Sequence, residues 1–201
     1  MKTLGTPPTR QTQAPRKRGD DTRARIIDET VRCVVEEGFP AATAKHVAER
    51  AGVTWGVIQY HFGDRDGLLM AVVDEGVARL LESLGRADVG DLPLRDRIEV
   101  VVDTAFECYS SPTSLAAFEI LRATRGTHER TTGRHLREIN AAITQLGRLI
   151  SDDPAHRGVA EVIWSALRGM VLVEMIVNEH LEWQDERRLL VEMVTRYLQD
   201  G

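Results

Sequence analysis

The stretch from Thr43 to Phe62 reads TAKHVAERAGVTWGVIQYHF, and it decides the fold because it encodes two short helices around a tight turn. The positions that these helices bury are apolar: Val47, Ala48, Ala51, Val53, Val57 and Ile58. Gly52 stands where the turn needs a residue that accepts positive φ, and Thr54 can cap the second helix. This spacing predicts a helix-turn-helix, a unit that presents its second helix to DNA.

The flanking segments extend this unit into an all-α chain of about nine helices. Before it, one helical face repeats apolar or small residues up to Gly38: Ile26, Ile27, Thr30, Val31, Val34 and Val35. After it, Asp64 can cap a long helix from about Arg65 to Leu84. Later apolar repeats predict helices near 98–109, from Ser111 and Pro112 onward, and near 136–150, 155–178 and 189–198. No convincing strand alternation occurs in the sequence.

Several residues of the first third of the chain form a combined pattern that is more specific than a generic helix-turn-helix. They are Gly38, Phe39, Thr43, Val47, Ala48, Ala51, Gly52, Val53, Thr54, Gly56, Tyr60, His61, Phe62, Arg65, Leu68 and Leu69. The pattern resembles the tetracycline-repressor (TetR) family of one-component transcriptional regulators. This resemblance implies an N-terminal three-helix DNA-binding domain and a C-terminal helical domain for effector binding and dimerisation. Ala42, Trp55 and Gln59 depart from the family's usual residues, so the DNA target cannot be taken from relatives.

We divide the chain into three parts: a flexible basic arm (1–20), a helix-turn-helix domain (21–66) and a helical effector-binding and dimerisation domain (67–201). The arm is rich in Thr, Pro, Gln and basic residues without apolar periodicity. Its cluster Arg16, Lys17 and Arg18 can reach phosphates or the minor groove, and a solvated tail is the alternative. The net charge is −5, but 11 Lys and Arg stand against 8 Asp and Glu through Arg65. The basic end is therefore the predicted DNA end.

The resemblance also implies which residues contact DNA. Donors for phosphates would be Thr43, Lys45, Thr54, Tyr60, His61 and Arg65. On the exposed side of the recognition helix, Gly56 would let the backbone approach, Gln59 can pair with adenine, and Trp55 can cover a thymine methyl or a sugar. Each has an alternative: Tyr60 can serve the core, His61 can bond a helix end, and Trp55 and Gln59 can pack on the arm or face solvent.

The segment near 155–178 is apolar nearly all round, so it must be covered on more than one side. A helical wheel separates a small-residue face (Val162, Ala166, Gly169, Val173 and Ile176) from a bulky face (Trp164, Leu167, Val171 and Met175). We assign the small-residue face to a dimer seam and the bulky face to a core or pocket, although the reverse stays open. The last helix would add Leu190, Met193, Val194 and Tyr197 to the seam. In the resembled family the last two helices of each subunit form a four-helix dimer interface, and a two-fold dimer matches a palindromic operator.

The resemblance further implies a pocket for a small-molecule effector. Large side chains that could line it are Phe106, Tyr109, Phe118, Leu121, Trp164 and Met175, and polar candidates are Arg122, Arg168 and Glu174. Plain core is the alternative for each apolar residue. Arg168 shares a strip with Glu161 and Ser165, which favours solvent over a ligand. Glu174 falls on the bulky face, where an unpaired carboxylate is costly, but a neighbouring Arg would satisfy it equally well.

The sequence contains no motif typical of a metal, redox, catalytic or cofactor-binding site. Cys33 and Cys108 form no metal or redox motif, so we expect buried reduced thiols. The six histidines show no metal-ligand spacing, and nucleophile elbows, phosphate loops and paired carboxylates are missing, so we expect no enzyme, cofactor or metal. The N-terminus lacks the hydrophobic run of a signal peptide and Glu174 interrupts the longest apolar stretch, which predicts a cytoplasmic protein without a membrane segment.

These features together predict a TetR-like regulator, in most cases of this family a repressor, that binds a palindromic double-stranded DNA operator as a homodimer. A small-molecule effector would release it. The alternative is a constitutive DNA-binding or helical adaptor protein whose body binds a protein partner. An enclosed cavity would favour the effector, whereas a filled core with an exposed apolar patch would favour the adaptor.

Overall fold

A computed structural model describes residues 14–126, 129–177, 179 and 181–200, and every regular element in these ranges is helical. The α-helices are α1 (Ala14–Glu37), α2 (Ala44–Ala51), α3 (Trp55–Phe62), α4 (Arg65–Gly85), α5 (Leu94–Ser110), α6 (Pro112–Ala123), α7 (Glu129–Ile150), α8 (Gly158–Val177) and α9 (Gln184–Asp200). Two 3-10 helices, η1 (Phe39–Ala41) and η2 (Pro154–His156), precede α2 and α8. The all-α prediction is confirmed.

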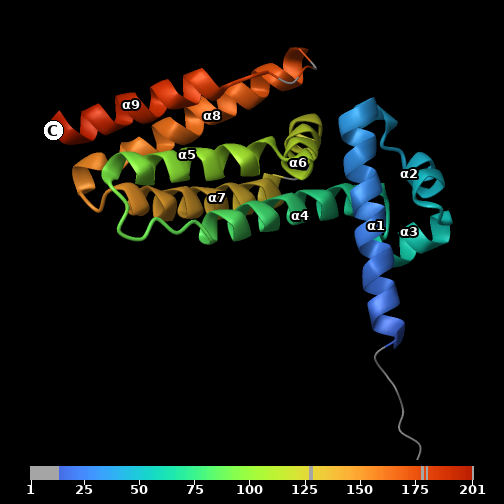
Figure 1. Cartoon of the computed structure of the whole chain (residues 1–201). Coiled ribbons are helices and arrows are strands. Elements are labelled where there is room, and N and C mark those ends of the chain that lie inside the picture. The colour runs from blue at the N-terminus through green and yellow to red at the C-terminus, as the bar shows by residue number, and fades with distance from the viewer. Residues whose placement is uncertain (1–13, 127–128, 178, 180, 201) are drawn as a thin grey trace, which may run out of the picture.

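Helix α1 begins inside the stretch that we predicted to be a flexible arm. It starts at Ala14, so Arg16, Lys17 and Arg18 stand on helical backbone rather than on irregular chain. No apolar repeat occurs in that stretch because this end of α1 projects beyond the other helices (Figure 1). Extending an anchored helix adds one hydrogen bond per residue without a new nucleation cost, so it needs no apolar face. The rest of the predicted arm, 1–13, lies outside the described residues.

Most of the predicted turn and cap signals are confirmed. Gly52 ends α2 with a φ of +63°. Asp64 caps α4 through a carboxylate oxygen that accepts from the Gly67 amide at 2.8 Å, and Ser111 caps α6 by accepting from the Ser114 amide at 3.3 Å. Thr54 does occupy the N-cap of α3, but its side chain accepts no capping hydrogen bond. That detail of the prediction was wrong, and the Thr54 hydroxyl is exposed instead.

Helix α1 stands across one end of the body formed by α4 to α9, and α2 and α3 lie on the far side of α1 (Figure 1). We call α1 to α3 the headpiece. A small core between the headpiece and the start of α4 buries Val47, Ile58 and Leu68 among others. A second core joins α1 to α4 and α6, and a third fills the body. The second core makes the headpiece and the body continuous, so a boundary at residue 66 marks a change of role rather than a gap in packing.

Helix α8 is buried on its bulky side and open on the other. Its buried residues are Ala160, Ile163, Trp164, Leu167 and Val171. Val162, Val173 and Ile176 on the opposite side are 60%, 40% and 73% exposed. In the ranges described, no helix joins enough length to enough apolar character to cross a bilayer.

Candidate DNA-binding face and ligand cavity

The exposed face of α3 presents the side chains that we predicted to read bases. Gln59 and Gly56 are exposed, Trp55 is 44% exposed and Tyr60 is 85% exposed. Ile58, on the opposite side, is fully buried in the headpiece core. The exposure of Tyr60 excludes the core role that was its alternative. Thr43, Lys45 and Thr54 are exposed beside this face, so seven of the predicted contact residues are accessible to DNA.

Two predicted phosphate contacts have internal partners. Arg65 donates from Nε to the Ala42 carbonyl at 2.8 Å, and its guanidinium lies over the Phe39 ring at 4.9 Å. His61 is half-buried, with its ring 5.0 Å from that of Tyr60 and 6.0 Å from that of Phe62. Arg65 therefore braces the start of α4 against η1, a role that the sequence prediction missed.

A network of ion pairs fixes α2 to α1. Arg50 of α2 contacts the carboxylates of Glu36 at 2.8 Å and Glu29 at 3.4 Å, and it also pairs with Glu37. The carboxylates of Glu36 and Glu37, Glu36 foremost, raise the pKa of the Arg50 guanidinium. His46 contacts Glu37 at 2.9 Å. The network holds α2 in place against α1. Sequence reasoning missed it because Arg50 lies on α2 and its carboxylate partners lie on α1.

A cavity of about 350 Å³ opens into the body between α4, α5, α6, α7 and α8. It brings together five of the predicted ligand residues: Tyr109, Phe118, Leu121, Trp164 and Arg168. The ring of Tyr109 lies edge-on to that of Trp164 at 5.1 Å and to that of Phe118 at 6.5 Å. The wall is therefore largely aromatic and aliphatic.

Polar groups stand at the exposed side of this cavity. Glu161, Ser165 and Arg168 of α8 are all exposed, and all three line it. The strip that we took for plain solvated surface is thus also the rim of the cavity. Within the wall, burial raises the pKa of the Tyr109 phenol to about 12, although Arg168 acts in the opposite direction. Tyr109 therefore stays neutral at physiological pH and can donate a hydrogen bond.

Four predicted ligand residues lie elsewhere, so those predictions were wrong for this cavity. Phe106 packs under the Arg187 guanidinium, 4.6 Å from its ring centre, and Arg122 is exposed on α6. Glu174 accepts hydrogen bonds from the Leu181 amide at 3.1 Å and from Trp183 Nε1 at 3.0 Å. Its carboxylate is thus satisfied by the link to α9. Met175 lines a different hollow, beside Val35 and Leu115.

The predicted dimer seam is exposed in the single chain. Val162, Ala166, Gly169, Val173 and Ile176 lie on the open side of α8, with Ala166 half-buried. On α9, Met193 and Tyr197 are 60% and 59% exposed, and Leu190 is half-buried. Val194 is only 7% exposed and contributes to the body core, and it also lines an apolar hollow with Val162, Met193 and Tyr197. The burial of the bulky side favours the small-residue side as the seam over the reverse assignment.

Comparisons with known proteins agree with this arrangement. Residues 26–72 match the family described as "Bacterial regulatory proteins, tetR family". This N-terminal segment belongs to the TetR family. The HTH-type transcriptional regulator BetI of Stenotrophomonas maltophilia is 37% identical over 87 residues, which cover 42% of this chain and 44% of BetI. The match thus spans less than half the length of that curated relative.

Solved structures extend the TetR fold through the body. The transcriptional regulator FadR from Bacillus subtilis, in complex with stearoyl-CoA, has a TM-score of 0.69 at 14% identity, over 85% of this chain and 96% of FadR. A TetR transcription regulator from Haloarcula marismortui has a TM-score of 0.68 at 16% identity, over 89% of this chain and 96% of that protein. At such identities the likeness concerns the fold alone.

The cavity includes residues that were not among the predicted ligand residues. Leu136 and Asn140 of α7 line it, as does Ser114 of α6. The strong apolar repeat of α7 placed Ile139 and Ile143 in the interior. It could not show that Leu136 and Asn140 border a cavity, because that depends on how α7 meets α6 and α8.

Proposed function

We propose that this TetR-family protein is a cytoplasmic transcriptional regulator that binds a palindromic operator as a homodimer and is released by a small-molecule effector. The observation that carries the proposal is the combination of an exposed reading face on α3 with an aromatic cavity whose wall includes Val77 and Ala117 of the core that α1 shares. The cavity supports an effector over an adaptor role. We infer repression because it is the commonest outcome in the resembled family.

The lining of the cavity indicates the class of effector. Tyr109, Phe118 and Trp164 offer ring faces and edges, and an aliphatic wall completes the apolar part. Arg168 and Asn140 supply a cation and an amide near the opening. Such sites bind apolar ligands and orient them with a few polar groups. A flat or elongated apolar molecule that carries an acidic or carbonyl group fits this chemistry.

The route from the cavity to the headpiece runs through α4 and α6. Gly76 and Val77 of α4 and Ala117 of α6 line the cavity, and Val77 and Ala117 are also buried in the core that α1 shares. A ligand that spreads these helices would therefore tilt α1 and alter the separation of the two α3 helices. It releases DNA only if it binds the DNA-incompetent arrangement more tightly.

Selection of preferred DNA from a random duplex pool, by the full-length protein at two salt concentrations, tests DNA recognition. The expected result is a two-fold symmetric motif whose half-sites lie about one helical turn apart. The Gln59→Ala variant is the control, because it should relax the preference at one base of each half-site. Sequence-independent binding that disappears with salt would contradict the proposal and would favour the constitutive role.

Binding of the anionic dye 8-anilinonaphthalene-1-sulfonate tests the cavity. Its rings match the aromatic wall, and its sulfonate matches Arg168. We expect saturable fluorescence that weakens in Arg168→Ala and persists in Arg148→Ala, which removes an exposed arginine of α7 outside the cavity. Equal dye binding by both variants would mean that Arg168 does not orient the dye in this cavity, and the assigned effector class would be withdrawn.

A further inference from the structure

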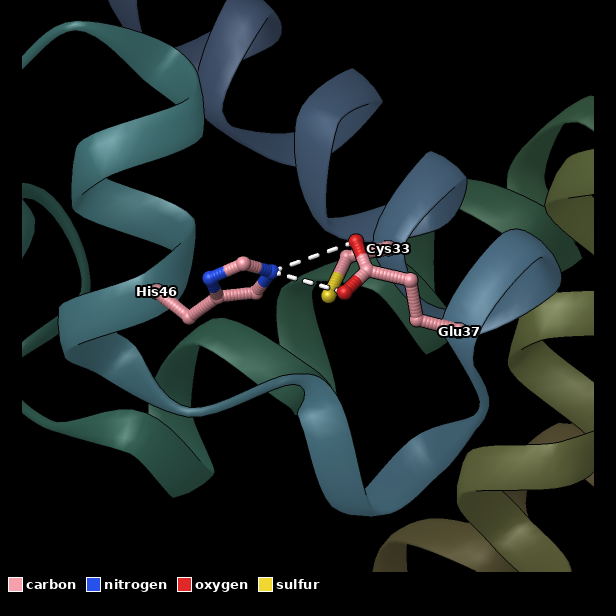
Figure 2. A group of neighbouring side chains, drawn as sticks. All are labelled: Cys33, Glu37 and His46. Atoms are coloured by element: carbon pink, nitrogen blue, oxygen red, sulfur yellow. Dashed lines mark hydrogen bonds and ion pairs between the residues drawn. The ribbon is translucent and has the colours of Figure 1, made fainter.

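Three side chains with metal-binding atoms converge between α1 and α2 (Figure 2). Cys33 and Glu37 stand one turn apart on α1, and His46 stands in the first turn of α2. Their sulfur, carboxylate oxygen and ring nitrogen all lie within 4.8 Å of one another. His46 Nε2 is 2.9 Å and 3.1 Å from the two Glu37 oxygens, so the donors already face a common point.

We propose that Cys33, Glu37 and His46 bind a thiophilic divalent cation such as Zn²⁺ and thereby link α1 to α2. A thiolate, an imidazole and a carboxylate are the ligand types that Zn²⁺ takes in proteins, whereas Mg²⁺ and Ca²⁺ avoid sulfur. Zinc bonds of about 2.0–2.3 Å in a tetrahedron place ligand atoms roughly 3.3–3.7 Å apart. To reach that range the His46–Glu37 separation, now a hydrogen-bond distance, must widen slightly, while no separation in the cluster exceeds 4.8 Å. Glu37 is exposed and His46 half-exposed, so water can fill the fourth position.

The charge around this cluster favours a cation. The carboxylates of Glu29, Glu36 and Glu37 face the guanidiniums of Arg32 and Arg50, which leaves an excess of one negative charge before the thiol ionises. Arg50 competes with a metal for Glu37. It has two other carboxylate partners on α1, at 2.8 Å and 3.4 Å, so it can release Glu37 without being left unpaired.

Proton release accompanies binding at this site. A metal-bound cysteine is a thiolate, so the Cys33 thiol must lose its proton on binding. When the metal binds, the S–H bond breaks, a metal–sulfur bond forms and the proton passes to solvent without any change of oxidation state. The affinity should therefore rise with pH.

The position of the cluster gives the metal a route to DNA binding that does not depend on the cavity. Helix α2 carries Lys45 and leads into α3 through the turn at Gly52. A metal bridge would fix α2 against α1 and restrict how α3 can be presented. It would change the affinity for the operator only to the extent that the metal binds one orientation of α3 more tightly than another.

Equilibrium dialysis of the tag-free full chain against Zn²⁺, together with Co²⁺ absorption spectroscopy, tests the site. We expect one metal per chain and a thiolate-to-Co²⁺ charge-transfer band. The His46→Gln variant should lower the affinity at least tenfold, and Cys33→Ser should abolish the band. The matched control is Cys108→Ser, which removes the other thiol, on α5, and should retain both signals.

Cys33 is fully buried, so Cys33→Ser can also weaken the fold. His46→Gln avoids this difficulty because the His46 side chain is 38% exposed. Failure of the wild-type chain to take up metal, or uptake that His46→Gln leaves unchanged in a folded protein, would overturn the proposal.

Discussion

The headpiece and the body are held together by different kinds of contact. In the headpiece a small apolar cluster around Val47 and Ile58 lies under α2 and α3, and surface ion pairs to Arg50 attach α2 to α1. In the body a larger core surrounds Leu167, and a cavity remains beside it. The headpiece therefore depends on a few polar contacts that solvent and ligands can exchange. The body is held by a larger apolar core, and a change in its helices would reach the headpiece through the core shared by α1, α4 and α6.

The largest effect expected of a single substitution falls on the body core. Leu167 is fully buried and contributes to the body core, whereas Leu172, on the same helix, is 39% exposed. Leu167→Ala should lower the free energy of unfolding by about 2–5 kcal/mol, because it removes buried methyl groups and leaves a cavity. Leu172→Ala is the matched control and should cost clearly less. Urea denaturation measures both, and equal losses would mean that the body core is not organised around this side of α8.

The junction between headpiece and body should be the next most sensitive place. A Cβ added at Gly67, in the first turn of α4, would lie 2.0 Å from the Phe62 carbonyl oxygen, which is backbone and cannot rotate away. Gly67→Ala should therefore destabilise the chain by about 1–3 kcal/mol and displace α3 relative to α4. At Gly85, the last residue of the same helix, a Cβ meets nothing within 4 Å. Gly85→Ala should be neutral or slightly stabilising, and thermal melts that ranked the two variants in the opposite order would refute this view of the junction.

The headpiece could be predicted well because its signals are local. The apolar spacing of Val47 and Ile58, the positive φ of Gly52 and the cap at Asp64 all act within one or two helical turns. Those interactions recur wherever the same short pattern occurs. The internal partners of Arg65 were not predictable in this way, because Ala42 lies 23 residues away and meets it only after η1 has turned the chain.

The cavity and the cysteine cluster could be predicted only in part, since each depends on how separate helices meet. Periodicity showed that Phe118 and Trp164 face inward, but it could not distinguish them from Phe106, which faces Arg187 instead. Likewise, Cys33 and His46 have no spacing typical of metal ligands. They come together because α2 folds back against α1, and Arg50 holds it there.

Two substitutions on the headpiece should separate recognition of the DNA base sequence from attraction to the DNA phosphate backbone. Gln59 is exposed on α3, and Gln59→Ala should reduce discrimination at one base pair by about tenfold while affecting unrelated DNA little. The side chain of Lys45 is 88% exposed. Lys45→Ala should weaken binding to every sequence alike and reduce the slope of log affinity against log salt by about one. Titrations of the selected operator and of a scrambled duplex at several salt concentrations distinguish the two, and identical profiles would remove the assigned division of labour.

The smallest effect expected concerns the body at alkaline pH. Because burial raises the pKa of Tyr109 from an ordinary 10.0 to about 12, the fold favours the neutral phenol. Its contribution to stability is complete below about pH 10 and is lost as the pH rises towards 12. Tyr109→Phe has no phenol to ionise, so its urea midpoint should fall less than that of the wild type between these two pH values. Tyr60→Phe changes an 85% exposed ring of the headpiece and is the control that should follow the wild type. A parallel decline of all three proteins would show that the wall of the cavity hydrates readily, which would make the body as adaptable as the headpiece.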